Sequence, residues 1–206
     1  MQIESIILGV SNLDRPIIDF ETDRLHIRTV CEADRDAYMS LRVNNSDLST
    51  AYSIIPGFED YEWESELQGN GDIYLSVFLK PDETFIASAS IQGYQTEIVE
   101  LGYDVVEEYR NQGFATEIVE GLRSETRRIR PDAEIIIRIN KDNEASKRVA
   151  EKCGGKFKRY EDSVVSRMLA SEIKEKSNNK EMNEIRLKMA ELVESGKDAV
   201  CVYELP

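Results

Sequence analysis

The sequence predicts an α/β protein of the mixed α+β kind, in which a central mixed sheet is flanked by helices on both faces. Two observations predict this fold class. The first is a run of short apolar segments separated by turn signals, which is typical of antiparallel strands. The second is a later order of strand, turn, helix, strand and helix, which packs helices against a sheet.

The N-terminal third is predicted to hold two strands and then two helices. Residues 3–10 form a short apolar strand, and 24–29 form a second strand in which apolar and polar side chains alternate. Residues 33–41 form a helix that ends at an Asn-Asn-Ser run. A short acidic helix lies within 58–71 and stops at a Gly-Asn-Gly end.

The middle of the chain is predicted to form four strands and one long helix. The strands cover 72–79, 85–92, 97–105 and 133–139. The helix covers 113–128, because apolar residues recur there at helical spacing and fall on one face. These residues are Phe114, Ile118 and Leu122.

After this helix and strand, the sequence predicts a short helix and a last hairpin. The helix covers 143–153, with Asp142 or Asn143 as its N-cap and two glycines after its end. The strands of the hairpin cover 156–160 and 164–168.

The C-terminal residues are expected to form an appended segment. A polar linker at 171–180 precedes an apolar helical stripe and a last strand at 199–204. The stripe consists of Met182, Ile185, Met189, Leu192 and Val193. This apolar face must pack on the domain or on a second copy of the chain, which would make a homodimer. The expected organisation is an extension over 1–20, a domain over 21–170 and the appended segment over 171–206.

The composition favours an acidic, metal-free protein of the cytoplasm. The 206 residues carry a formal net charge of −14, which disfavours nucleic acid or an anionic membrane surface as a partner and favours a cationic substrate. No apolar run approaches the ~18 residues that a membrane span needs, and the N-terminus lacks a signal-peptide pattern. Cys31, Cys153 and Cys201 form no CxxC pair, so we expect neither disulfides nor a zinc site. His26, the one histidine, alternates with apolar residues and is expected to be structural.

The bend between the predicted strand at 97–105 and the next helix has the chemistry of an anion site. A helix N-terminus offers unpaired N–H groups and the positive end of the helix dipole. Gly113 lets the backbone approach a ligand closely, Arg110 adds a positive charge, and Ala115 keeps the first turn open. The chain has neither a GKS or GKT ending nor a GxGxxG pattern, which excludes a Walker-type ATPase and disfavours a dinucleotide-binding dehydrogenase. A plain strand-to-helix turn is the alternative.

The segment around this bend resembles the acyl-CoA-binding motif of the GCN5-related N-acetyltransferase (GNAT) superfamily. The residues Tyr-Arg-Asn-Gln-Gly-Phe-Ala-Thr-Glu, at 109–117, are most similar to the branch that acetylates the N-termini of ribosomal proteins. Residues 21–38 resemble the opening strand and helix of that family. Residues 139–157 resemble its second motif, and the whole resemblance covers 21 to about 169.

The resemblance implies acetyl-CoA as co-substrate. It implies that the strand at 97–105 splays from the strand at 133–139, and that the pantetheine arm enters the gap. The residues it implies for CoA binding are Tyr103, Val105, Arg110, Asn111, Gln112, Gly113, Phe114, Ala115, Thr116, Asn143 and Ser146. Glu117 is read as a structural first-turn acid.

Acetyl transfer to an amine sets two proton problems. An alkyl amine with a pKa of about 10 must lose a proton before it attacks, and the leaving thiolate benefits from a donor. Glu100 is the candidate base, since its strand face looks into the cleft; a solvated strand glutamate is the alternative. The Val105 N–H is a candidate oxyanion donor. Many members of the family carry a Tyr acid where this chain has Ala150, so Ser146 is the nearest replacement, with an ordinary helix serine as the alternative.

The acceptor pocket is expected at the acidic helix within 58–71. Carboxylates there surround two aromatic rings and could gather a cationic amine, either a small molecule or a protein N-terminus; a solvated helix face is the alternative. The substrate-binding candidates are Tyr61, Glu62, Trp63 and Glu66. A non-catalytic acyl-CoA-binding module is the rival to the enzyme, because the acid position is altered.

Overall fold

The structure is a computed structural model that describes residues 16–45, 57–69, 71–162 and 199–206. Several predicted elements lie outside these residues. They are the strand at 3–10, the hairpin strand at 164–168, the linker at 171–180 and the apolar stripe from Met182 to Val193. None of the helices in the described parts is both long and apolar enough to cross a membrane.

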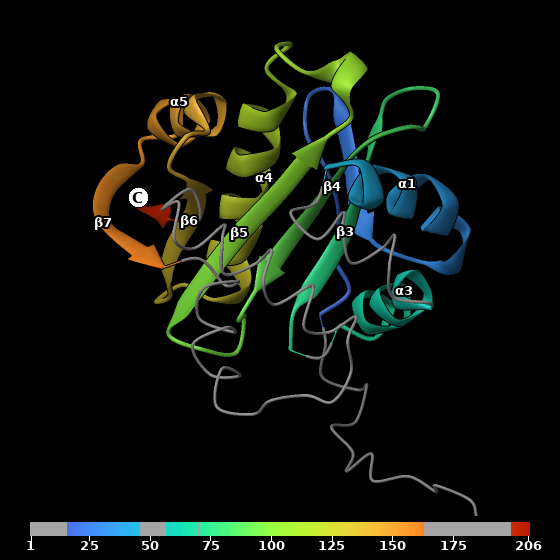
Figure 1. Cartoon of the computed structure of the whole chain (residues 1–206), viewed down its shortest axis with the longest axis horizontal. Helices are drawn as coiled ribbons and strands as arrows, with labels where there is room; N and C mark the ends of the chain where they lie inside the picture. The colour runs from blue at the N-terminus through green and yellow to red at the C-terminus, as the bar shows by residue number, and fades with distance from the viewer. Residues whose placement is uncertain (1–15, 46–56, 70, 163–198) are drawn as a thin grey trace, which may run out of the picture.

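The described residues form one eight-stranded mixed sheet, in the order β1-β2-β3-β4-β5-β6-β8-β7 (Figure 1). All neighbouring strands are antiparallel except β5 and β6, which are parallel. The strands are β1 Asp19–Glu21, β2 Leu25–Thr29, β3 Ile73–Leu79, β4 Thr84–Gln92, β5 Ile98–Val105, β6 Glu134–Asn140, β7 Lys156–Asp162 and β8 Ala199–Leu205. The predicted mixed sheet is confirmed.

Helices cover both faces of this sheet, as the sequence predicts. The described α-helices are α1 Arg35–Asn45, α3 Phe58–Gln68, α4 Phe114–Ile129 and α5 Glu144–Lys152. Two short 3₁₀ turns, Glu32–Asp34 and Glu107–Tyr109, precede α1 and the bend before α4. The predicted helices at 113–128 and 143–153 are thus confirmed with small shifts at their ends.

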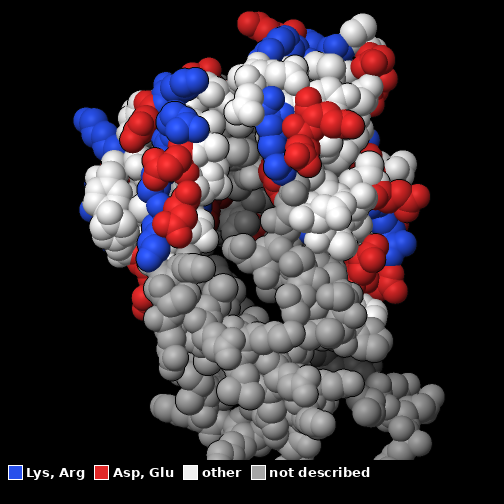
Figure 2. All heavy atoms as spheres, turned by 45° about the horizontal axis from the view of Figure 1, so that its top comes forward, with Lys and Arg blue, Asp and Glu red and all other residues white. Residues whose placement is uncertain are grey.

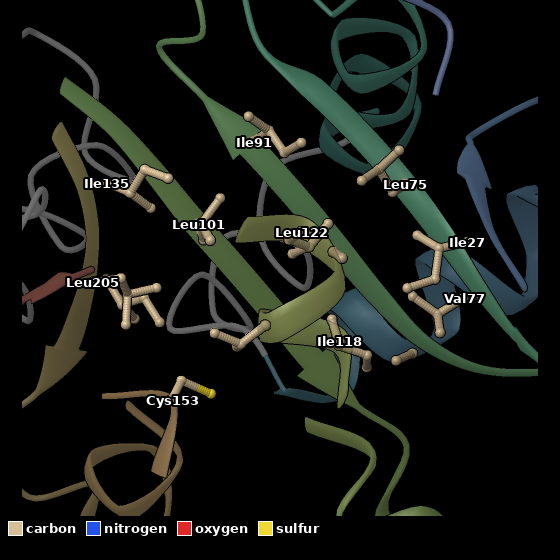
Figure 3. Packing of buried hydrophobic residues seen from close by; sticks show 14 of the residues in the cluster. Ile27, Leu75, Val77, Ile91, Leu101, Ile118, Leu122, Ile135, Cys153 and Leu205 are labelled. Carbon is tan, nitrogen blue, oxygen red and sulfur yellow. The ribbon is translucent and has the colours of Figure 1, made fainter. Parts of the chain in front are cut away.

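The main core lies between α4, α5 and the sheet. Ile118 and Leu122 of α4 are fully buried, and Figure 3 shows them facing the strands that carry Leu75 and Leu101. Burial of each such side chain contributes about 1.5–3 kcal/mol. A second, smaller cluster of Val30, Tyr38, Met39 and Trp63 packs α1 and α3 on the opposite face. The main core packs α4 against β5 and therefore fixes the position of the bend between them.

The C-terminal strand β8 is inserted between β6 and β7. Tyr203 lies opposite Ile137 of β6 on one side and Phe157 of β7 on the other. The predicted strands at 156–160 and 199–204 are therefore confirmed, but they pair with each other. Strand β8 is thus a full member of the sheet, although it belongs to the segment that the sequence analysis treats as appended to the domain. Its alternating apolar side chains are buried on the face that holds the main core.

Candidate functional site

Strands β5 and β6 separate part of the way along their length. Their parallel pairing runs from Ile98 opposite Glu134 to Glu100 opposite Ile136 and ends there. Beyond that point β5 stays paired with β4 as far as Val105, while β6 stays paired with β8. The predicted splay is confirmed, and it opens the sheet edge between the two strands.

Backbone groups of β5 face this opening. The Val106 N–H donates to the Ile86 carbonyl of β4 at 2.9 Å, and antiparallel pairs alternate between facing their partner and facing away. Val105 and Tyr103 therefore direct their N–H and C=O groups away from β4, toward the splay. The Val105 carbonyl accepts from Arg110 Nε at 2.9 Å. The Val105 N–H and the Tyr103 groups can pair with the amides of an extended ligand.

The bend after β5 presents consecutive amides. Among the described residues, the N–H groups from Asn111 through Thr116 donate to no protein acceptor, and the next paired amide is Glu117, which donates to the Gly113 carbonyl at 3.2 Å. Asn111 and Gly113 both have positive φ, 61° and 84°, so successive N–H groups point inward. With the N-terminus of α4 behind them, these amides have the arrangement that suits an anion.

Two side chains of the bend do not point at this site. Arg110 turns back to the end of β5, where its guanidinium also lies 4.0 Å from Asp104 Oδ1. Gln112 Nε2 donates to the Glu108 carbonyl at 2.9 Å. These two predicted ligands thus shape the bend, and the groups that the bend leaves open to an anion are backbone amides.

The turn between β1 and β2 supports the bend from behind, which the sequence analysis did not foresee. Glu117 accepts from Thr22 Oγ1 at 2.6 Å, from the Arg24 N–H at 2.8 Å and from Arg24 Nε at 2.7 Å. Burial raises the pKa of Glu117, but the hydrogen bonds from Thr22 and Arg24 outweigh burial and hold that pKa below its usual value. Arg24 belongs to the strand predicted at 24–29. No sequence pattern connects it with Glu117, which lies 93 positions further along the chain.

A buried hydroxyl lies between β5 and α5. Tyr103 Oη is buried and has no hydrogen-bond partner among the described residues. Burial raises the pKa of Tyr103, and the nearby Ser146 side chain opposes that shift without meeting hydrogen-bond geometry. A buried polar atom with no partner is costly, so this hydroxyl fits a ligand with polar groups in the splay.

The start of α5 places Ser146 beside that hydroxyl and uses Asn143 as a cap. Asn143 Oδ1 accepts from the Ser146 N–H at 3.0 Å, which is the N-cap role that the sequence predicts. The Asn143 oxygen is therefore engaged in the helix, whereas the Ser146 hydroxyl stands toward Tyr103.

Glu100 lies on the sheet face opposite α4. Its carboxylate pairs with Arg138 Nη1 of β6, and Arg138 Nε also donates to Glu161 Oε2 of β7 at 2.8 Å. The hydrogen bond from Arg138 lowers the pKa of Glu161. Glu100 is 26% exposed, so this ion-paired carboxylate remains accessible to solvent at the position where the strands part.

A pocket of about 430 Å³ lies beside this ion-pair network. It is lined by Arg138, Tyr160, Glu161, Asp162 and Ala199. Figure 2 shows that the described surface is hollowed in the middle of the face that comes forward, with acidic and basic side chains on both sides of the hollow. A cationic group that enters this pocket would meet Glu161 and Asp162 close to Glu100.

The four acceptor candidates on α3 do not form one surface. Trp63 is buried in the second core cluster, and its Nε1 donates to Glu32 Oε2 at 3.2 Å. Glu66 is buried and pairs with Arg42 at 3.2 Å, and burial raises its pKa. Tyr61 is 67% exposed, and Glu62 lies 3.8 Å from Arg42. The prediction differs from the structure because one face of α3 packs on the sheet. This packing buries Trp63 and Glu66, which the charge pattern had assigned to a ligand.

The fold and the bend have counterparts among known proteins. The model of the acetyltransferase (GNAT) domain matches residues 24–156. The chain therefore belongs to the GNAT family of acetyltransferases, a family that uses acetyl-CoA, and the resemblance seen in the sequence is confirmed. Comparison with curated proteins finds no significant match by sequence.

Solved structures share this fold at low sequence identity. One is a ribosomal L7/L12 alpha-N-protein acetyltransferase in complex with coenzyme A, with a TM-score of 0.63 and 16% identity over 92% of this chain and 97% of that one. Another is the ribosomal-protein-S5-alanine acetyltransferase of Vibrio fischeri, with a TM-score of 0.56 and 17% identity over 71% and 87%. A third is a spermidine N-acetyltransferase mutant of Vibrio cholerae, with a TM-score of 0.60 and 14% identity over 87% and 93%.

Proposed function

We propose that the chain transfers the acetyl group of acetyl-CoA to a primary amine, which attacks the thioester directly. The observation that carries this proposal is the run of unpaired amides from Asn111 through Thr116, next to the opening between β5 and β6. An anion site and an open strand edge side by side suit a ligand that joins a diphosphate to an arm with two amides.

Residues of the splay and the bend would hold acetyl-CoA, which supplies an acetyl thioester when bound. The amides of the bend would bind the diphosphate. The backbone of Tyr103 and Val105 would bind the amides of the arm, and the unpartnered Tyr103 hydroxyl would gain a polar partner. These residues fit the co-substrate because each offers a group that lacks a protein partner.

Glu100 would accept the proton of the attacking amine. Its carboxylate lies at the point where the strands part, on the face that holds the pocket. Arg138 pairs with this carboxylate from the neighbouring strand and so holds it in place. General base catalysis of this kind contributes about 10²–10⁴-fold.

Ser146 would donate to the departing sulfur. Its hydroxyl lies at the start of α5, beside Tyr103, on the side of the splay opposite the pocket. The dipole of α5 favours negative charge at this end of the helix.

The acceptor would enter through the pocket beside Glu161 and Asp162. These carboxylates and the net charge of −14 favour a cationic amine. The acceptors named for the structural neighbours are of two kinds, spermidine and protein N-termini. We place the chain in the branch that acetylates ribosomal-protein N-termini on the wording of residues 109–117, and we keep the small amine as the second candidate acceptor.

One experiment tests the function and the rival reading together. Release of free CoA would be measured with spermidine and with peptides that begin with alanine or serine, while the dissociation constant of CoA is measured separately. Turnover on one of these amines supports the transferase. Tight CoA binding with no turnover on any amine would support a non-catalytic acyl-CoA-binding module instead.

A further inference from the structure

Arg24 is fixed against the bend by three contacts. Its Nε pairs with Glu117 Oε2 at 2.7 Å, its Nη1 donates to the Gln112 carbonyl at 3.1 Å, and its Cζ lies 4.2 Å from the centre of the Phe114 ring. The third nitrogen, Nη2, lies 3.5 Å from the position that a Cβ on Gly113 would take. One guanidinium at the end of a distant strand thus spans the bend from Gln112 to Glu117.

The bend needs such a support, because its own hydrogen bonds are few. The amides that face a ligand cannot also hold the loop, and two of its residues have positive φ. A non-glycine residue in that conformation, such as Asn111, costs of order 1–3 kcal/mol unless its surroundings hold it. The Arg24 guanidinium binds the Gln112 carbonyl and leaves the N–H groups of the bend free for a ligand.

The chemistry of arginine suits this task. The planar guanidinium can donate to a carboxylate and to a carbonyl at the same time and can lie over an aromatic ring, whereas a lysine can do only part of this. Glu117 is held from three directions, by Thr22, by the Arg24 N–H and by the Arg24 side chain, so the pair is anchored in the backbone of the β1–β2 turn.

We propose that Arg24, acting through Glu117 and Gln112, is a positioning residue that holds the bend in the conformation that binds the CoA diphosphate. The inference rests on the proposed function. It makes one specific claim: the clamp serves the diphosphate end of the donor and has no part in the reaction at the thioester.

The test compares two donors in the full-length protein. Acetyl-CoA carries the diphosphate, and acetyl-pantetheine does not. Arg24→Gln is expected to raise the KM for acetyl-CoA and the dissociation constant of CoA about tenfold, with kcat nearly unchanged. The value of kcat/KM for acetyl-pantetheine should stay as in the wild type. A purely structural defect would lower activity with both donors.

Companion variants separate the clamp from a direct charge effect. Glu117→Gln keeps the Arg24 charge but removes its main anchor, so it should weaken CoA binding as Arg24→Gln does, and the double variant should be no weaker than either single variant. Arg24→Lys should recover only part of the loss. The matched control is Arg128→Gln, which removes an ion pair with Glu125 far along α4. It should leave kcat and KM unchanged with both donors.

The outcomes are distinct. If the wild type fails to bind CoA, the proposed function fails. If the wild type binds CoA and Arg24→Gln or Glu117→Gln binds it equally well, this inference alone is overturned. Equal losses with both donors would also overturn it.

Discussion

Glu100 of β5 lies opposite Ile136 of β6, and this is the last position at which the two parallel strands pair. The carboxylate proposed as base therefore lies where the sheet opens. The amides that face an anion lie further along the same chain, after the end of β5. Strand β5 thus places the proposed base where the sheet opens, and its end leads directly into the proposed co-substrate site.

Replacement of Glu100 by Gln should remove turnover and leave CoA binding intact. The amide cannot accept the proton of the amine, so we expect kcat to fall about 10²–10⁴-fold. The measurement is CoA release at saturating amine, with the dissociation constant of CoA determined alongside. Glu134→Gln, at the start of the neighbouring strand β6, is the control. Full activity in Glu100→Gln would assign the base to another group.

Replacement of Gly113 by Ala should weaken CoA binding about tenfold or more. Gly113 has a φ of 84°, which L side chains rarely adopt, so the substitution strains the bend. A Cβ there would lie 3.5 Å from Arg24 Nη2, an ordinary van der Waals contact, so the strain is in the backbone. Gly57→Ala is a matched control, because its φ of 76° brings a similar strain far from the bend and a Cβ meets nothing within 4 Å. Equal CoA affinity in both variants would contradict the proposed site.

Replacement of Ser146 by Ala should lower kcat about tenfold with little change in the KM for acetyl-CoA. The hydroxyl is proposed to donate to a thiolate, and hydrogen bonds to charged groups contribute about 1.5–3 kcal/mol. Steady-state kinetics at saturating amine would show the change. Ser124→Ala, on the exposed side of α4, should be silent. An unaltered kcat in Ser146→Ala would reduce Ser146 to an ordinary helix residue.

Replacement of Glu161 by Gln should raise the KM for the amine and leave the KM for acetyl-CoA unchanged. Glu161 lines the pocket beside Arg138, and its charge is proposed to attract the acceptor. In the wild type, added salt should raise the amine KM, and this salt dependence should be weaker in the variant. If the amine KM and its salt dependence both match the wild type, the acceptor enters elsewhere.

The stability of the fold should decrease as pH rises above the ordinary histidine range. The hydrogen bond to Glu83 raises the pKa of His26, burial opposes this, and Asp19 adds to the increase. A raised folded-state pKa stabilises the protein fully below the unfolded pKa of about 6.5, and this contribution is lost as pH rises through the folded value.

Thermal melting between pH 5.5 and pH 8.5 would measure this effect. The wild type should lose stability over this range, and His26→Gln should be flatter, since His26 is the one histidine of the chain. The placement of His26 between two carboxylates also agrees with the structural role that its sequence pattern predicts. A melting temperature that rises with pH in the wild type and not in the variant would contradict this prediction, because protonation of His26 would then destabilise the fold.

Local patterns predicted most of the elements around the site. Ile118 and Leu122 recur at helical spacing because one face of α4 is buried, and the strand at 97–105 shows period-two alternation because one face packs on that helix. The bend that is proposed to bind an anion was also predictable as a structure, since a glycine before a helix N-terminus is a local feature. These properties depend on neighbours in the sequence.

Long-range relationships were not predictable in the same way. Strand β8 pairs with β6 and β7 from far along the chain, so the pattern of 199–204 revealed a strand but not its partners. Arg24 and Glu117 meet only because β2 and α4 are brought together by the sheet. Arg138 likewise reaches Glu100 only across the boundary between β5 and β6.

The acidic helix shows where a charge pattern misleads. Trp63 and Leu67 are four residues apart, so they share a face with Glu66 close by, and this face packs on the sheet. The spacing of Trp63 and Leu67 fits a buried face, although the helix as a whole shows almost no apolar periodicity. The prediction of an acceptor site rested on the number of carboxylates in this helix. It therefore assigned buried side chains to a ligand-binding surface.

The central claim is that the amides from Asn111 through Thr116 bind the diphosphate of CoA. The direct measurement is a ¹⁵N–¹H NMR titration of the full chain with CoA, with pantetheine as the partner ligand that lacks a diphosphate. The account predicts large shifts of these amide resonances with CoA and much smaller ones with pantetheine, while Tyr103 and Val105 respond to both. Saturable CoA binding that leaves the resonances of the bend in place would contradict it.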